Sequence, residues 1–238
     1  MIRFLLLNAF VAAYSILFCL WGMILSLFDT RGGLVHRYCA VPWARGILRA
    51  CGVKVLLSGE ENLDPAVPRI YVCNHQSYFD IFVLLAHLPV HFKFVMKEEL
   101  MRIPLLGTAM RGARYIGIDR QDPRKALKGM AEAAERIREG ASILIFPEGT
   151  RSLDGELQPF KPGGFHLALK ARCDILPLAI LNSRFIVPKG SLRIRKGTVE
   201  MRIGNPLPLE GYSKKNMPLL MDRVWKGMSD LMNPEAVG

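Results

Sequence analysis

From residue 53 onward, short apolar runs alternate with stretches of helical character, and this alternation restricts the fold more than any other feature of the 238-residue chain. The runs rich in aliphatic and aromatic residues that read as strands are 53–57, 69–73, 92–96, 115–118, 142–146, 176–181 and 199–203. Asp122 and Pro123 begin a helix that ends at Gly140, and a last helix covers about residues 217–232. This alternation predicts an α/β fold with a mixed, largely parallel sheet flanked by helices.

The N-terminal segment has a different character. Residues 4–28 contain no charged side chain, and as a helix they would be about 37 Å long, enough to cross a bilayer. Arg3 precedes the segment and no small-residue cleavage site follows it, so we expect it to be retained rather than removed as a signal peptide. Residues 29–54 carry one acid, Asp29, and five cations, which favours the cytoplasmic side for the rest of the chain: Arg31, Arg37, Arg45, Arg49 and Lys54.

Residues 34–51 predict a second, amphipathic helix lying along the lipid headgroups. The two helices would form a hairpin that enters one leaflet, and the alternative is a single membrane span followed by a linker. We therefore expect N-terminal membrane-anchoring helices in residues 1–52 and a folded domain in residues 53–238. The expected location is the cytoplasmic face of the inner membrane, with a monotopic attachment or a single N-terminal anchor.

The net charge of +11 indicates a polyanionic partner. The basic residues are scattered through apolar segments without a zinc-finger or RNA-binding signature, so a membrane lipid surface or a phosphorylated small molecule is favoured and nucleic acid is not. Five cysteines without a CxxC motif predict free thiols in a reducing compartment. No Cys/His spacing typical of a metal site occurs, so we predict no metal.

A histidine and an aspartate follow the apolar run 70–73, in the sequence Asn-His-Gln-Ser-Tyr-Phe-Asp of residues 74–80. On one helix His75 and Asp80 would lie about 140° apart around the axis, so a turn must separate them if they are to meet. Ser77 and Asp80 match a capping box, which predicts that the helix starts at Ser77 and that His75 folds back onto Asp80. Ligands and chemistry in α/β folds collect at the carboxyl ends of strands, where this pair falls.

Two other predicted strands end in comparable polar residues. The run 142–146 leads into Pro-Glu-Gly-Thr-Arg-Ser at 147–152, and the run 115–118 leads into Asp119 and Arg120. An arginine such as Arg151 offers a planar pair of donors suited to phosphate. The blocks at 74–80, 118–120 and 146–152, taken in chain order, resemble those of the glycerolipid acyltransferases, most closely the bacterial 1-acylglycerol-3-phosphate acyltransferases, over about residues 53–205. Two positions depart from the family pattern: Arg114 stands where glycine is usual, and Gly117 stands where phenylalanine or proline is usual.

The resemblance implies transfer of a fatty acyl group from acyl-CoA or acyl carrier protein to the sn-2 hydroxyl of 1-acylglycerol-3-phosphate, a lysophospholipid, giving phosphatidic acid. No cofactor beyond this co-substrate is expected. His75 would act as the base and Asp80 would orient it. The residues implied in binding the acceptor are Lys97, Arg120, Glu148, Gly149, Thr150 and Arg151.

Three readings of the function remain open. Besides the 1-acylglycerol-3-phosphate acyltransferase, the chain could acylate another lyso-lipid, such as a lyso-ornithine lipid, or be a non-catalytic membrane-binding relative. No G-x-S-x-G motif is present, so a serine acyl-enzyme is not predicted. Cys73 is the one candidate for a covalent nucleophile, and direct attack by the acceptor hydroxyl is favoured over it.

Overall fold

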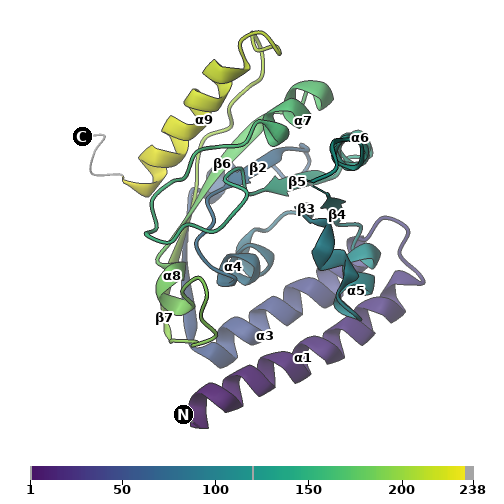
Figure 1. Cartoon of the computed structure of the whole chain (residues 1–238), viewed down its shortest axis with the longest axis vertical. Coiled ribbons are helices and arrows are strands. Elements are labelled where there is room, and N and C mark those ends of the chain that lie inside the picture. Colours follow the sequence, from purple (N-terminus) through teal and green to yellow (C-terminus); the bar gives the residue numbers. More distant parts are fainter. Residues whose placement is uncertain (1, 120, 234–238) are drawn as a thin grey trace.

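The computed structural model describes residues 2–119 and 121–233 (Figure 1). This part of the chain contains a seven-stranded sheet with the order β1-β7-β6-β2-β5-β3-β4. The strands are β1 (Val53–Ser58), β2 (Ile70–Cys73), β3 (Phe92–Lys97), β4 (Ile116–Ile118), β5 (Ser142–Ile145), β6 (Ile175–Leu181) and β7 (Gly197–Ile203). Neighbouring strands are parallel except for β6 and β7. All the predicted strands are present, and the predicted fold class is confirmed.

Helices cover both faces of the sheet (Figure 1). The longer helices that follow α1 (Ile2–Ser26) are α3 (Val41–Cys51), α4 (Phe79–His87), α6 (Pro123–Arg138), α7 (Gly163–Ala171) and α9 (Met217–Met232). Tyr71 and Cys73 of β2 belong to the apolar cluster that includes α3 and α4, whereas Ile70 and Val72 belong to the cluster with α6, α7 and α9. Because β2 is buried on both faces, its sequence is apolar throughout rather than alternating.

Shorter helical segments connect these elements. They are η2 (Glu60–Asn62), η3 (Glu98–Arg102), α5 (Leu106–Gly112) and α8 (Ser183–Ile186). The predicted helix after Asp122 is confirmed as α6, and the Asp122 side chain caps it by accepting hydrogen bonds from the backbone N–H groups of Arg124 and Lys125. The predicted last helix is confirmed as α9.

The N-terminal segment forms α1 (Ile2–Ser26), which among the described residues is the one helix long and apolar enough to cross a membrane by length and composition. A second helical run follows, made of α2 (Gly33–Val35), the π-helical segment η1 (His36–Ala40) and α3. Figure 1 shows α1 beside α3 below the sheet. The Trp43 indole N–H donates to Ser15 Oγ at 3.0 Å, which joins the two helices.

We expected the apolar face of the second helix to lie against lipid headgroups, and this is wrong because that face is buried inside the protein. Ala44, Ile47 and Leu48 are at most 3% exposed and pack in the same core as α4 and β1. An amphipathic helix buries its apolar stripe against whatever apolar surface is next to it, and here that surface is protein. The division of the chain at residue 52 stays a prediction, although α3 shares its core with the residues beyond that boundary.

Candidate active site

The turn after β2 brings His75 and Asp80 together. Helix α4 begins at Phe79, two residues later than predicted, so His75 lies in the turn. Asp80 Oδ2 lies 2.7 Å from His75 Nδ1, and this confirms the predicted contact. The same oxygen accepts the backbone N–H groups of Gln76 and Ser77 at 2.7 and 2.9 Å. The bond from Ser77 is one half of the predicted capping box, whereas Ser77 Oγ accepts from Phe79 N instead of completing it.

The imidazole of His75 is held in one orientation. Its ring stacks on Phe146, with ring centroids 4.0 Å apart and planes 15° apart. The buried Asp80 carboxylate accepts a hydrogen bond from Nδ1–H, which leaves Nε2 as the nitrogen able to act on a substrate. The His75 side chain is 17% exposed and that of Asp80 is fully buried, so only the histidine can reach a substrate.

Glu148 fixes the backbone of His75. One carboxylate oxygen of Glu148 accepts His75 N–H at 2.9 Å and the other accepts Gln158 N–H at 3.2 Å. The Ser152 N–H donates in return to the His75 carbonyl at 2.7 Å. Burial raises the pKa of Glu148 to about 7, although the two N–H donors act in the opposite direction. Glu148 is 3% exposed, and its contact with His75 N–H supports the turn that carries the histidine.

The next three residues line a cavity together with His75. Gly149 has φ of 71°, a left-handed conformation that favours glycine and turns the chain here. The Arg151 guanidinium lies over the Tyr78 ring, 3.7 Å from its centroid. One nitrogen of that guanidinium, Nη1, is buried and has no hydrogen-bond partner within the described residues. Stacking on Tyr78 therefore fixes the orientation of the Arg151 guanidinium at the cavity wall.

The structure supports a role in the site less clearly for Lys97 and does not describe Arg120, the two other cations that the sequence predicts there. Lys97 lines the cavity, but its side chain is 55% exposed and pairs with Glu99 at 3.1 Å. Arg120 lies outside the described residues. Two residues shortly before Arg120 depart from the family pattern. Arg114 has φ of 61°, a left-handed conformation that explains why glycine is usual at that position. A Cβ on Gly117 would lie 2.0 Å from a Glu98 carboxylate oxygen, so a larger side chain does not fit there.

The cavity has a volume of about 610 Å³ and is mainly apolar. A row of aromatic rings lies along it, because Phe146 beside His75 is followed by Phe94 at 6.3 Å and Tyr115 at a further 5.4 Å, measured between ring centroids. Tyr115 packs against the cluster of Val35, Cys39 and Ala113, which also lines the cavity. Helices α1, α4 and α5 contribute to its walls. Its volume and apolar lining suit a hydrocarbon chain beside His75.

Two polar side chains that sequence reasoning assigned no role also support the site. Asn74 exchanges two hydrogen bonds with the backbone of Ile180, at 2.8 and 2.7 Å, and so ties the turn after β2 to β6. Lys189, from the segment after α8, donates to the Arg151 carbonyl at 2.7 Å. Both contacts join residues far apart in the sequence, so no local pattern indicates them.

Cys73 is poorly suited to nucleophilic attack. Its side chain is fully buried, and burial raises the pKa of the thiol well above its usual value. Cys73 is also absent from the residues that line the cavity. Among residues 2–119 and 121–233, no group of three histidine, cysteine or acidic side chains is arranged to hold a metal ion.

An α/β sheet that carries a His–Asp pair beside an apolar cavity has the features that an acyltransferase acting on lipids requires. The family model described as Acyltransferase matches residues 54–181. The chain belongs to the acyltransferase family, as the sequence blocks predict.

Relatives in this family carry a consistent name. The chain is 34% identical to a 1-acyl-sn-glycerol-3-phosphate acyltransferase of Chlamydomonas reinhardtii, over 94% of this chain and 71% of the algal protein. It is 37% identical to the chloroplastic enzyme of that name from Arabidopsis thaliana, with 76% of this chain and 51% of the plant protein covered. The crystal structure of the 1-acyl-sn-glycerophosphate acyltransferase PlsC from Thermotoga maritima matches with a TM-score of 0.82 and 25% identity, over 99% of this chain and 97% of that chain.

Proposed function

We propose that the protein transfers a fatty acyl group from an acyl thioester to the sn-2 hydroxyl of 1-acylglycerol-3-phosphate and so produces phosphatidic acid. The observation that carries this proposal is the His75–Asp80 pair beside the apolar cavity, which Arg151 also lines. The relatives' names point to the same acceptor. The thioester is a co-substrate, and no further cofactor is proposed.

The reaction proceeds by direct attack within a complex of both substrates. His75 Nε2 removes the proton from the acceptor hydroxyl as its oxygen attacks the thioester carbonyl carbon. The Asp80 carboxylate stabilises the imidazolium that forms and holds the ring in place. The tetrahedral intermediate then collapses, the carbon–sulfur bond breaks, and the thiolate of the carrier takes the proton from His75. The acyl ester is complete and the histidine is neutral again.

Arg151 binds the acceptor phosphate in this proposal. Replacing Arg151 by alanine is expected to raise the KM for 1-acylglycerol-3-phosphate about ten- to a hundredfold, because a charge-assisted hydrogen bond contributes about 1.5–3 kcal/mol. The KM for the acyl donor should change little. Steady-state kinetics with each substrate varied in turn would measure both constants, and Arg138→Ala, at an exposed arginine on α6, is the matched control. Equal changes in both constants would assign Arg151 a structural role instead.

The apolar cavity holds the acyl chain of the donor. Ala109 lines the cavity where α5 approaches α1, since a Cβ on Gly22 would be 3.7 Å from the Ala109 Cβ and 2.9 Å from Cys39 Sγ. Ala109→Leu should shift the preference toward shorter acyl donors, since excluding two methylenes costs about 1.6 kcal/mol, or about fifteenfold in relative kcat/KM. Competition between acyl donors of different length would measure the shift. Ala109→Ser keeps the size and should leave the preference unchanged, and an unchanged preference in Ala109→Leu would place the acyl chain elsewhere.

The attachment to lipid is monotopic in this proposal. Both ends of α1 contact the folded domain: Asn8 Nδ2 donates to the Leu192 carbonyl at 3.2 Å, and a Cβ on Gly112 of α5 would lie 2.7 Å from the Ser26 Cβ. A helix that crossed the bilayer would carry these ends to opposite sides, about 30 Å apart, and the polar domain could not follow. Exposed residues recur on one side of α1 and would enter a single leaflet: Leu6, Phe10, Leu17, Leu20 and Ile24.

A substrate panel tests the proposed reaction. The purified full-length protein would be incubated with lyso-lipids of different headgroups and with acyl-CoA or acyl carrier protein as donor, and the products identified by mass spectrometry. Phosphatidic acid should be the main product. Preferential acylation of a lyso-ornithine lipid would favour the second function, and no product from any pair would favour a non-catalytic relative. The bonded His75–Asp80 pair argues against the last outcome. The experiment also identifies the carrier of the donor.

A further inference from the structure

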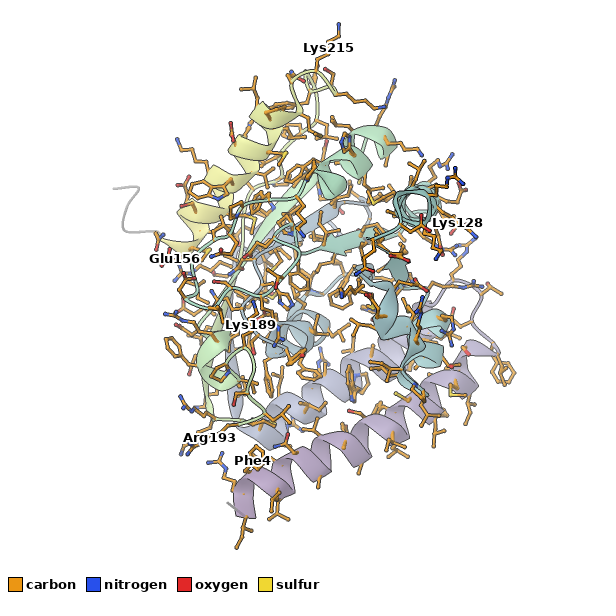
Figure 2. The ribbon with its side chains drawn as sticks, in the orientation of Figure 1. Phe4, Lys128, Glu156, Lys189, Arg193 and Lys215 are labelled. Carbon is orange, nitrogen blue, oxygen red and sulfur yellow. The ribbon has the colours of Figure 1, made fainter. Side chains whose placement is uncertain are left out.

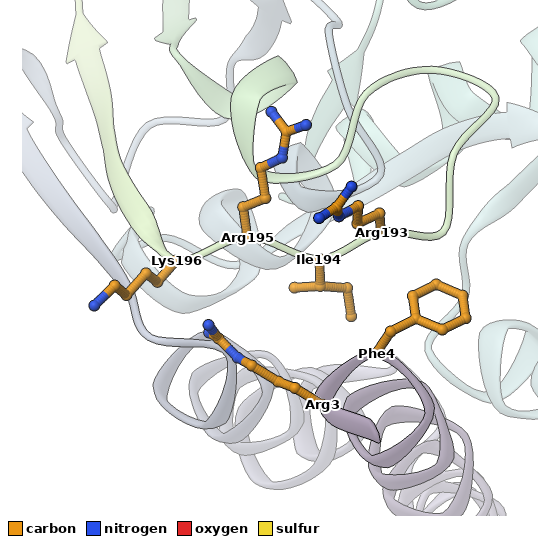
Figure 3. A pocket seen from close by; sticks show the side chains of 6 residues that line it. All are labelled: Arg3, Phe4, Arg193, Ile194, Arg195 and Lys196. Atoms are coloured by element: carbon orange, nitrogen blue, oxygen red, sulfur yellow. The ribbon is translucent and has the colours of Figure 1, made fainter. Parts of the chain in front are cut away.

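A second hollow lies at the N-terminal end of α1. It has a volume of about 690 Å³ and is lined by Arg3 and Phe4 of α1 and by residues 193–196 of the segment that leads into β7 (Figure 3). None of these residues lines the acyl cavity. Figure 3 shows the Arg3 side chain extending from α1 toward this segment, with Ile194 directed toward the helix. We call this site the α1 end hollow.

The α1 end hollow is strongly cationic. Four of its six lining residues are Arg3, Arg193, Arg195 and Lys196, and all four are exposed. In the part of the chain that the structure describes, no acidic side chain forms an ion pair with any of them. Figure 3 shows the Arg195 side chain directed away from α1, so the four cations are spread along the hollow and the segment above it. Like charges this close along the chain repel one another, and the surface therefore favours an anion.

The segment that carries these cations has a defined backbone. Arg195 N–H donates to the Ile186 carbonyl at 2.9 Å, and Arg193 N–H donates to Ser191 Oγ at 3.0 Å. Ile194 packs against the core cluster of α3 and α4. The bond from Asn8 to the Leu192 carbonyl fixes the segment against α1. Arg193, Arg195 and Lys196 therefore lie on a segment whose backbone is held in place by these contacts.

Apolar side chains surround the same cations. Ile2 is 74% exposed, Leu5 is 58% exposed and Leu192 is 65% exposed, while Phe4 forms part of the wall itself. A free phosphate ion or an acidic protein surface would use the cations and leave these residues in water. A phospholipid would use both, because its phosphate can meet the cations while its acyl chains cover the apolar residues.

We propose that the α1 end hollow binds the phosphate-bearing headgroup of an anionic phospholipid and thereby fixes the N-terminal end of α1 at the membrane surface. The inference rests on the proposed monotopic attachment of α1 and does not depend on acyl transfer. The bound lipid is distinct from the acceptor, whose reacting hydroxyl must reach His75.

Vesicle binding by the full-length protein tests this inference. The variant Arg193→Gln/Arg195→Gln/Lys196→Gln is compared with Lys128→Gln/Lys214→Gln/Lys215→Gln, which loses the same charge; Figure 2 places Lys128 and Lys215 far from Arg193 and Phe4. Binding to phosphatidylcholine vesicles that contain phosphatidylglycerol should fall about a hundredfold in the first variant, since each basic residue near the surface contributes about fivefold. It should fall less than fivefold in the control. Binding to pure phosphatidylcholine should be unchanged in both.

Several outcomes would overturn the inference. Equal losses in the two variants would mean general electrostatic attraction without a site. Unchanged vesicle binding together with a higher KM for the acyl donor would make the hollow a docking surface for the carrier. Release from phosphatidylglycerol vesicles by inorganic phosphate, but not by an equal concentration of chloride, would identify a site for free phosphate. His75→Ala should bind vesicles like the unmodified chain, so failure of the proposed reaction would leave this result intact.

Discussion

Replacement of His75 by alanine is expected to lower kcat for acyl transfer by about 10²- to 10⁴-fold, the range that a positioned general base contributes. The acceptor hydroxyl is a weak nucleophile while it keeps its proton, and His75 is the side chain placed to remove that proton. Its Nδ1 is hydrogen-bonded to Asp80 and its ring face stacks on Phe146, and His75 borders the cavity. The initial rate of free thiol release from acyl-CoA, or of phosphatidic acid formation, would measure the loss.

The matched control for this variant is His166→Ala, because His166 is exposed on α7 and far along the chain from the turn after β2. The control should retain full activity. Folding of the His75 variant should be preserved, since Asp80 still accepts the N–H groups of Gln76 and Ser77. Transfer within tenfold of the unmodified protein would remove His75 from the role of base.

The features that the sequence predicts well depend on residues close together in the chain. Each strand is a short apolar run, and Asp122 and Pro123 mark the N-terminus of α6. The His75–Asp80 contact is predictable for the same reason, since the capping box places a turn between residues only five positions apart. The strand-end rule then places Gly149, Thr150 and Arg151 at the same edge as His75, and all four line one cavity.

Other features depend on contacts that no local pattern encodes. The Glu148 carboxylate accepts a hydrogen bond from the backbone of His75, which is 73 positions away in the sequence. The Asn74 amide is hydrogen-bonded to the backbone of Ile180, which is 106 positions away. The sequence pattern of an amphipathic helix is the same whether its apolar face contacts lipid or the protein core. The pattern of α3 therefore cannot reveal that Ile47 is buried in protein. The α1 end hollow joins Arg3 to residues 193–196, and only the folded chain brings the two segments together.

Replacement of Asp80 by asparagine is expected to lower kcat by about 10³- to 10⁴-fold, as loss of the orienting carboxylate does in a catalytic triad. Asparagine keeps the size and one acceptor oxygen, so the bonds to Gln76 and Ser77 can form, but it cannot stabilise a charged imidazolium. Its amide would also occupy the position of Asp80 Oδ1, a buried atom without a hydrogen-bond partner in the described part of the chain. An unsatisfied buried donor costs about 1–3 kcal/mol, so a lower Tm is expected as well.

The two consequences of the Asp80 change can be separated experimentally. Asp80 is fully buried and touches neither substrate, so the KM values for donor and acceptor should remain close to those of the unmodified enzyme while kcat falls. Kinetics should therefore be measured well below the Tm of the variant, with the folded fraction determined by circular dichroism and Asp222→Asn on α9 as the control. A loss of kcat that merely follows the unfolded fraction would reduce Asp80 to a structural residue. A loss that persists in fully folded protein would establish that its charge acts on the reaction through His75.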